Sequence, residues 1–123
     1  MSDIFGPCPT TIVLREIHDE RESQIFGHGF DRAGDDQYTK NQLPLAAAAY
    51  LVHGTRAVRC RAEFADGQTH LVPDAWPHDW DTLHFKPSSE DRRRDLVKAA
   101  ALVVAEIERI DRAAGQLEGE GGQ

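Results

Sequence analysis

Acidic and histidine side chains in the first third of the sequence are of the types that hold a divalent cation. His18 and Glu22 are four residues apart, which places them on one face of a helix at a workable ligand spacing. The other members of this group are Asp19, Glu20, His28, Asp31, Asp35 and Asp36. Charge runs are also typical of a solvated helix face followed by a turn. The sequence therefore predicts either a weak metal site or an ordinary acidic surface.

Aromatic and basic residues gather between positions 76 and 94, an arrangement that suits a phosphorylated ligand. Aromatic faces stack on any base, and arginine binds phosphate through two nitrogens. A helix that begins near Ser89 would add free backbone N–H groups. The candidate ligand-binding residues are Trp76, Trp80, His84, Lys86, Arg92, Arg93 and Arg94. The alternative is that the tryptophans cover a helical core and the arginines lie at the surface.

The remaining ionisable residues form no familiar catalytic arrangement. The sequence contains no defensible Ser-His-Asp spacing, no G-x-x-x-x-G-K-[ST] and no G-x-G-x-x-G. Glu106 is predicted to pair with Arg109 or Lys98 rather than to act in catalysis. We therefore expect no catalytic residues of these classes.

The last helix is the clearest element that could position these residues. It is predicted to begin after Pro87 with Ser88 or Ser89 as its N-cap, and to end at Gly115. One helical face carries Leu96, Ala100, Val103, Ile107 and Ile110. Further apolar residues widen this surface, so we expect the middle of the helix to be buried on most sides. Packing of this helix could extend across a homodimer.

Two further helices and a hairpin are expected before it. The first helix is predicted at about 10–26 and the second at about 42–53, where Ala46 to Ala49 would allow close helix contact. Residues 57–73 alternate in polarity around an Asp66-Gly67 turn, which predicts a β-hairpin or an ordered loop. The fold class is therefore mainly α, with about three main helices and a short insertion.

Size and charge exclude several classes of protein. The chain has 123 residues, of which 40% are hydrophobic and 28% charged, which suits one globular domain. We expect that domain to span 1–114, followed by a glycine-rich tail at 115–123. A net charge of −7 argues against general nucleic-acid binding. We see no membrane span or signal peptide, so we expect a cytoplasmic protein in which Cys8 and Cys60 are free thiols.

Several stretches resemble a group of uncharacterised small phage and prophage proteins. They are ERESQ at 20–24, DDQYT at 35–39, WPHDW at 76–80 and FKP at 85–87. A fifth stretch, RRRDLVKAAALVVAEIER at 92–109, resembles the basic, alanine-rich last helix of that group. The likeness covers most of the chain, and it implies a helical fold without an agreed activity.

The chain is also distantly similar to the MazG-like all-α nucleotide pyrophosphohydrolases. That resemblance implies a helical fold, a nucleotide-sized pocket and Mg²⁺ bound by carboxylates on two helices. The chain departs from the pattern at 45–50, where LAAAAY stands in place of the first acidic motif. Asp95 can stand for one carboxylate of the second motif, but Lys98 occupies the position of the other. These departures imply binding without hydrolysis.

Three functions remain open at this point. The first is a phage-type accessory protein that binds a small nucleotide-like phosphorylated ligand without turnover, and so counteracts host defence. The second is a divergent metal-dependent pyrophosphohydrolase, with Mg²⁺ held by Glu20, Glu22, Asp35, Asp36 and Asp95. The third is an acidic interaction module that inhibits a host protein, since residues 1–36 hold eight acids and three bases.

Overall fold

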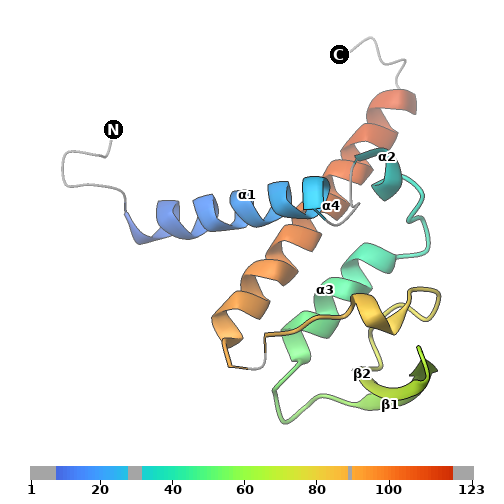
Figure 1. Cartoon of the computed structure of the whole chain (residues 1–123). Coiled ribbons are helices and arrows are strands. Elements are labelled where there is room, and N and C mark those ends of the chain that lie inside the picture. Colours follow the sequence, from blue (N-terminus) through green and yellow to red (C-terminus); the bar gives the residue numbers. More distant parts are fainter. Residues whose placement is uncertain (1–7, 28–31, 89, 118–123) are drawn as a thin grey trace.

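The protein is mainly helical, as the computed structural model of residues 8–27, 32–88 and 90–117 shows (Figure 1). The elements are α1 (Pro9–Gly27), α2 (Arg32–Asp35), α3 (Gln42–Val52), β1 (Cys60–Ala65), β2 (Gln68–Pro73), the 3-10 turn η2 (Thr82–His84) and α4 (Arg92–Leu117). This confirms the predicted class, mainly α with a small hairpin. The candidate residues His28, Asp31 and Ser89 lie outside the described residues.

The hydrophobic core lies between α3 and α4, which run side by side (Figure 1). Its buried members are Leu43, Ala46, Ala47, Ala49, Tyr50, Val72, Trp76, Ala99, Leu102 and Ala105. Alanine has little volume, so the two helix backbones can approach closely. This confirms the contact predicted for the alanine block. β2 and the segment before α4 close the core from the other side.

The face of α4 that the sequence singled out is not the buried one. Val103, Ile107 and Ile110 are 42%, 52% and 50% exposed, whereas Leu102 and Ala105 are buried. Between positions 97 and 107 only Val103 and Ile107 are exposed, so the prediction that the middle of the helix is buried on most sides is confirmed, and only the choice of the buried face was wrong. Apolar residues occur around much of the helix, so periodicity alone could not tell which side α3 covers.

The ends of α4 also differ from the prediction. The helix begins at Arg92, and the Asp91 carboxylate accepts a hydrogen bond from the Arg94 N–H at 3.1 Å, as an N-cap does. Ser88 instead donates its backbone N–H to Asp95. The helix continues through Gly115 to Leu117. Within the described residues, no helix is long and apolar enough to cross a membrane.

α1 packs on α4 through polar side chains. Its buried residues are Glu20, Arg21 and Gln24. The aliphatic residues of its first half, Ile12 and Leu14 among them, are 46% and 60% exposed. Figure 1 shows this half of α1 extending away from the rest of the fold. Ion pairs of Glu16, Glu20 and Arg21 with α4 therefore help to hold the helix on the body of the protein.

The hairpin follows the predicted turn. β1 and β2 pair antiparallel, and Ala65 stands opposite Gln68 across a two-residue loop. Asp66 and Gly67 both have positive φ, 52° and 77°, which a type I′ turn requires and which glycine adopts without strain. Cys60 begins β1, and both it and Cys8 are exposed free thiols.

Candidate functional site

A network of polar contacts joins the end of α3 to the start of α4. We call it the α3–α4 corner and define it as His53, Lys86, Arg92, Asp95 and Lys98. The Arg92 guanidinium donates to the backbone carbonyls of Tyr50 at 3.2 Å and His53 at 2.9 Å, and also to that of Leu51. Carbonyls at a helix C-terminus lack partners within the helix and carry partial negative charge. Arg92 therefore caps α3 while its own side chain stays at the surface.

Asp95 is the buried acid of the corner. It is only 1% exposed, and its Oδ1 accepts the Ser88 N–H at 2.7 Å. Its Oδ2 lies 3.6 Å from Nδ1 of His53, whose side chain is 34% exposed. The ring of His53 also stands edge-on to Phe85, with 5.6 Å between centroids. A buried carboxylate and an aromatic ring therefore hold a partly exposed imidazole.

Tyr50 joins the two lysines of the corner to the core. Its hydroxyl accepts the Lys86 N–H at 3.0 Å, and burial raises the pKa of this phenol. The Lys98 ammonium donates to the Lys86 carbonyl at 2.6 Å and lies 5.7 Å from the centre of the Tyr50 ring. An ammonium has three donors, so Lys98 keeps two for a ligand.

The corner carries more positive than negative charge. Lys86 and Arg92 are exposed and Lys98 is half-buried, while Asp95 supplies one buried negative charge. Ammonium and guanidinium groups are the donors that bind phosphate or another oxyanion. In a protein with a net charge of −7, this local surplus is an exception. The arrangement can hold an anionic group.

The structure separates the seven predicted ligand-binding residues into three groups. Lys86 and Arg92 belong to the corner, and the exposed His84 lies two residues before Lys86. Trp76 is 1% exposed and packs edge-on against Trp80, with 5.4 Å between centroids. The tryptophans therefore cover the helical core, which was the alternative offered by the sequence, and Trp76 presents no face for a base to stack on.

Arg93 and Arg94 point toward α1 rather than toward the corner. Arg93 makes a bidentate ion pair with Glu16, in which Nη1 donates to Oε2 at 2.7 Å. Arg94 lies 2.6 Å from the buried Glu20. Each arginine and its partner are more than 70 residues apart in the sequence. Rules for residues three or four apart on one helix cannot detect such pairs.

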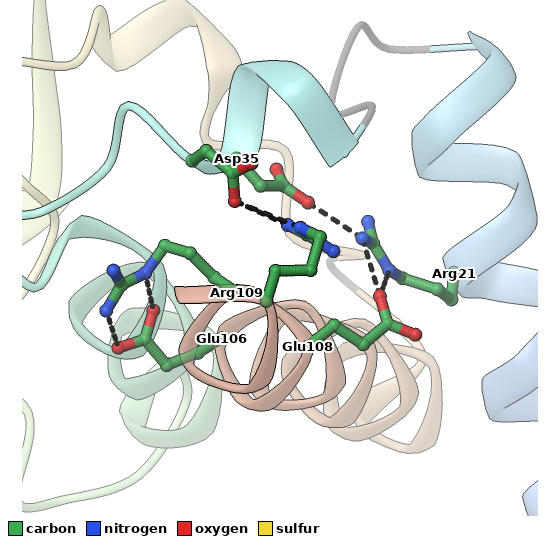
Figure 2. Close-up of polar contacts among 7 residues, drawn as sticks. Arg21, Asp35, Glu106, Glu108 and Arg109 are labelled. Carbon is green, nitrogen blue, oxygen red and sulfur yellow. Dashed lines mark hydrogen bonds and ion pairs between the residues drawn. The ribbon is translucent and has the colours of Figure 1, made fainter. Parts of the chain in front are cut away.

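The predicted metal-ligating residues also have partners of their own. Figure 2 shows the Arg21 side chain between Asp35, at 2.7 Å, and Glu108, at 2.9 Å. Arg112 binds Asp36 at 2.8 Å. Glu22 lies 3.8 Å from His18 on the outer face of α1, and Asp95 lies in the corner. Among the residues that the structure describes, no three His, Cys, Asp or Glu side chains gather closely enough to hold a metal ion.

The predicted pairing within α4 is confirmed. Arg109 donates to both carboxylate oxygens of Glu106, at 2.9 and 2.8 Å (Figure 2). This pair lies at i, i+3, a spacing at which side chains on a helix meet. Both oxygens of the Glu106 carboxylate are therefore engaged in an ion pair within the helix.

The sequence did not identify His53 and Lys98 as members of the α3–α4 corner, or Tyr50 as the core residue that contacts it. Lys98 was visible as a cation in place of a carboxylate, a substitution that favours an anion over a metal ion. His53 and Tyr50 gave no signal, because they reach the corner only through the packing of α3 on α4.

Comparison with models of protein families, with curated proteins and with solved structures gives no significant match for this chain.

Proposed function

We propose that this chain binds a small phosphorylated ligand, nucleotide-like in character, at the α3–α4 corner and releases it unchanged. The observation that carries the proposal is that the cationic side chains of Arg92 and Lys98 lie at the same corner as His53 and the buried Asp95, where Lys98 binds the backbone of the exposed Lys86. A phosphate would meet the free donors of Lys98 and the outward edge of the imidazole. In biological terms the protein would be a phage-type accessory protein that sequesters a signal of host defence.

Binding without turnover is supported by the state of the carboxylates. Hydrolysis of a phosphoanhydride by this class of fold would need Mg²⁺ on several carboxylate oxygens. Asp35 and Asp36 instead neutralise Arg21 and Arg112. Moving Asp35 to a metal would break its 2.7 Å ion pair with the buried Arg21, which is costly. The metal-dependent pyrophosphohydrolase remains the alternative that the first experiment distinguishes.

The experiment is a nucleotide panel, cyclic nucleotides included, mixed with excess protein and Mg²⁺. After filtration, both the filtrate and the denatured protein are chromatographed. A nucleotide that disappears from the filtrate and returns intact on denaturation supports the proposal. A new product peak supports the hydrolase, and an unchanged panel contradicts both.

Substitutions in the α3–α4 corner test whether the ligand binds there. Lys98→Gln and His53→Asn should each weaken binding about tenfold, since a charge-assisted hydrogen bond contributes roughly 1.5–3 kcal/mol. Lys40→Gln is the matched control, because it removes one exposed lysine charge outside the corner. Equal affinity of Lys98→Gln and Lys40→Gln would place the ligand elsewhere.

A second candidate function is favoured by the exposed first half of α1. We propose as the alternative that this helix contacts a host protein. Ile12 and Leu14 are aliphatic and largely exposed, and the acidic Asp19 lies further along the same helix. An exposed apolar patch with a charged rim is typical of an interaction surface. Pull-downs should then give a salt-sensitive complex that Ile12→Ser/Leu14→Ser abolishes and Leu45→Ser does not.

A further inference from the structure

An apolar stripe runs along the solvent side of α4. It consists of Leu96, Val103, Ile107 and Ile110, which are 40%, 42%, 52% and 50% exposed. Three of them follow one another at intervals of seven residues, the spacing at which apolar residues form a seam between two helices. The core of the protein uses the other sides of α4. In the part of the chain that the structure describes, the stripe is therefore an exposed second apolar face of a helix that already packs on α3.

The charges beside the stripe indicate what covers it. Arg93 and Asp111 are 18 residues apart, which is five full turns at 3.6 residues per turn. They lie on the same edge of the stripe, one at each end. The side chain of Arg93 remains 57% exposed although it binds Glu16, and Asp111 is exposed. The edge therefore carries a guanidinium, shared with Glu16, at one end and a carboxylate at the other.

A second copy of α4 satisfies this pattern when it runs antiparallel. With Val103 opposite Val103 of the copy, Leu96 stands opposite Ile110, since each is seven residues from the centre. Arg93 then lies within two residues of the copy's Asp111, about 3 Å along the helix axis, which its side chain can span. Two-fold symmetry repeats both contacts. A parallel two-fold pair would instead place the Arg93–Asp111 edges of the two copies on opposite sides of the seam, with Arg93 level with Arg93, so that neither charge meets its opposite.

We infer that the protein forms a two-fold symmetric dimer through antiparallel pairing of the α4 stripes. Four large aliphatic side chains from each copy leave water, and a charge pair closes each end. The inference does not depend on the proposed ligand, because it rests on the stripe and its charged edge; of the α3–α4 corner, only Arg92 lies on this face, at its N-terminal end.

Sedimentation velocity between micromolar and millimolar concentration tests the association. The mean mass should rise from 13.7 kDa toward twice that value. Val103→Glu places two like charges opposite each other at the symmetry axis and should weaken the dimer by about tenfold or more. Leu45→Glu, at a residue of matched exposure on α3, should leave it unchanged. A chain that stays monomeric throughout, or that responds equally to both variants, overturns the inference.

Disulfide trapping tests the orientation. In a background with Cys8→Ser and Cys60→Ser, mixed Leu96→Cys and Ile110→Cys proteins should form a mixed disulfide dimer on mild oxidation. Neither protein alone should do so, because an antiparallel pair keeps like positions about 20 Å apart. Efficient crosslinking of Leu96→Cys to itself would mean a parallel pair and would overturn the inference. Far-UV circular dichroism of each variant checks that the fold is retained.

Discussion

The carboxylate of Asp95, 1% exposed, lies 3.6 Å from Nδ1 of His53, whose ring reaches the surface. The two residues come from different helices, and 41 positions separate them in the sequence. Asp95 also accepts the Ser88 N–H at 2.7 Å and so ties the segment before α4 to the helix itself. One buried acid thus fixes both a backbone turn and an imidazole.

Asp95 should therefore contribute to stability independently of any ligand. Asp95→Ala leaves the Ser88 N–H without its acceptor, and we expect a loss of roughly 1–3 kcal/mol in the free energy of unfolding. Asp95→Asn retains an acceptor oxygen of the same size and should cost less. Urea unfolding followed by tryptophan fluorescence measures both losses, since Trp76 is in the core. Equal losses in the two variants would mean that charge, not the hydrogen bond, is what matters here.

The three long helices and the hairpin could be predicted, because each is a local pattern, whereas the short α2 and η2 were not predicted. Helix start signals located α3, periodicity located α4, and the Asp66-Gly67 pair located the hairpin turn. The end of α4 could not be located in this way, since Gly115 lies within the helix and not after it. A glycine in a helix costs only about 1 kcal/mol, which the turns around it outweigh.

The site could be predicted only in part, because its members meet through packing. Lys86 and Arg92 were included on the basis of charge, and they do lie in the corner. His53 and Lys98 were not, since they join it only when α3 packs on α4. Trp76 was read as a binding residue, yet the same packing places it in the core. Residue type alone does not distinguish these cases.

Removal of Arg21 or Asp35 should destabilise the protein strongly. Both side chains are buried, at 4% and 0% exposure, and their ion pair measures 2.7 Å. Arg21→Met or Asp35→Leu leaves the other charge buried without this partner, which typically costs about 3–5 kcal/mol. The double variant should lose less than the sum of the two, because it removes both charges.

The control for this pair is Arg112→Met, which breaks the more exposed contact with Asp36. It should cost about 1 kcal/mol or less. Urea unfolding of all four variants measures the difference. Additive losses in the double variant would show that Arg21 and Asp35 act separately.

Arg92 should affect stability and ligand binding, whereas Lys98 should affect mainly binding. The Arg92 fork donates to three carbonyls at the end of α3, so Arg92→Ala should cost about 1–2 kcal/mol and lower the melting temperature. Arg92→Lys keeps the charge but cannot reproduce the fork, and should recover only part of that loss. Arg59→Ala, at an exposed arginine in another segment, is the control. A melting temperature unchanged in Arg92→Ala would refute the capping role.

Tyr50 should make the protein lose stability in alkaline solution. Burial raises the pKa of its phenol above the ordinary 10.0, the negative charges of Asp95 and Glu20 raise it further, and the Lys86 N–H lowers it. The unfolded chain therefore releases this proton first as the pH increases. The stabilisation is complete below pH 10 and is lost as the pH rises through the folded pKa.

Two measurements together test the predicted loss of stability in alkaline solution. They are an absorbance titration at the phenolate band and urea unfolding on either side of pH 10. Wild type should show a tyrosine component that ionises above pH 10, and Tyr50→Phe should lack it. The variant loses the hydrogen bond to Lys86, so it should be weaker by about 1 kcal/mol at neutral pH. Its stability should nevertheless fall less steeply than that of wild type above pH 10. A steeper or equal fall in the variant would mean that Tyr50 ionises as readily in the folded protein as in the unfolded chain.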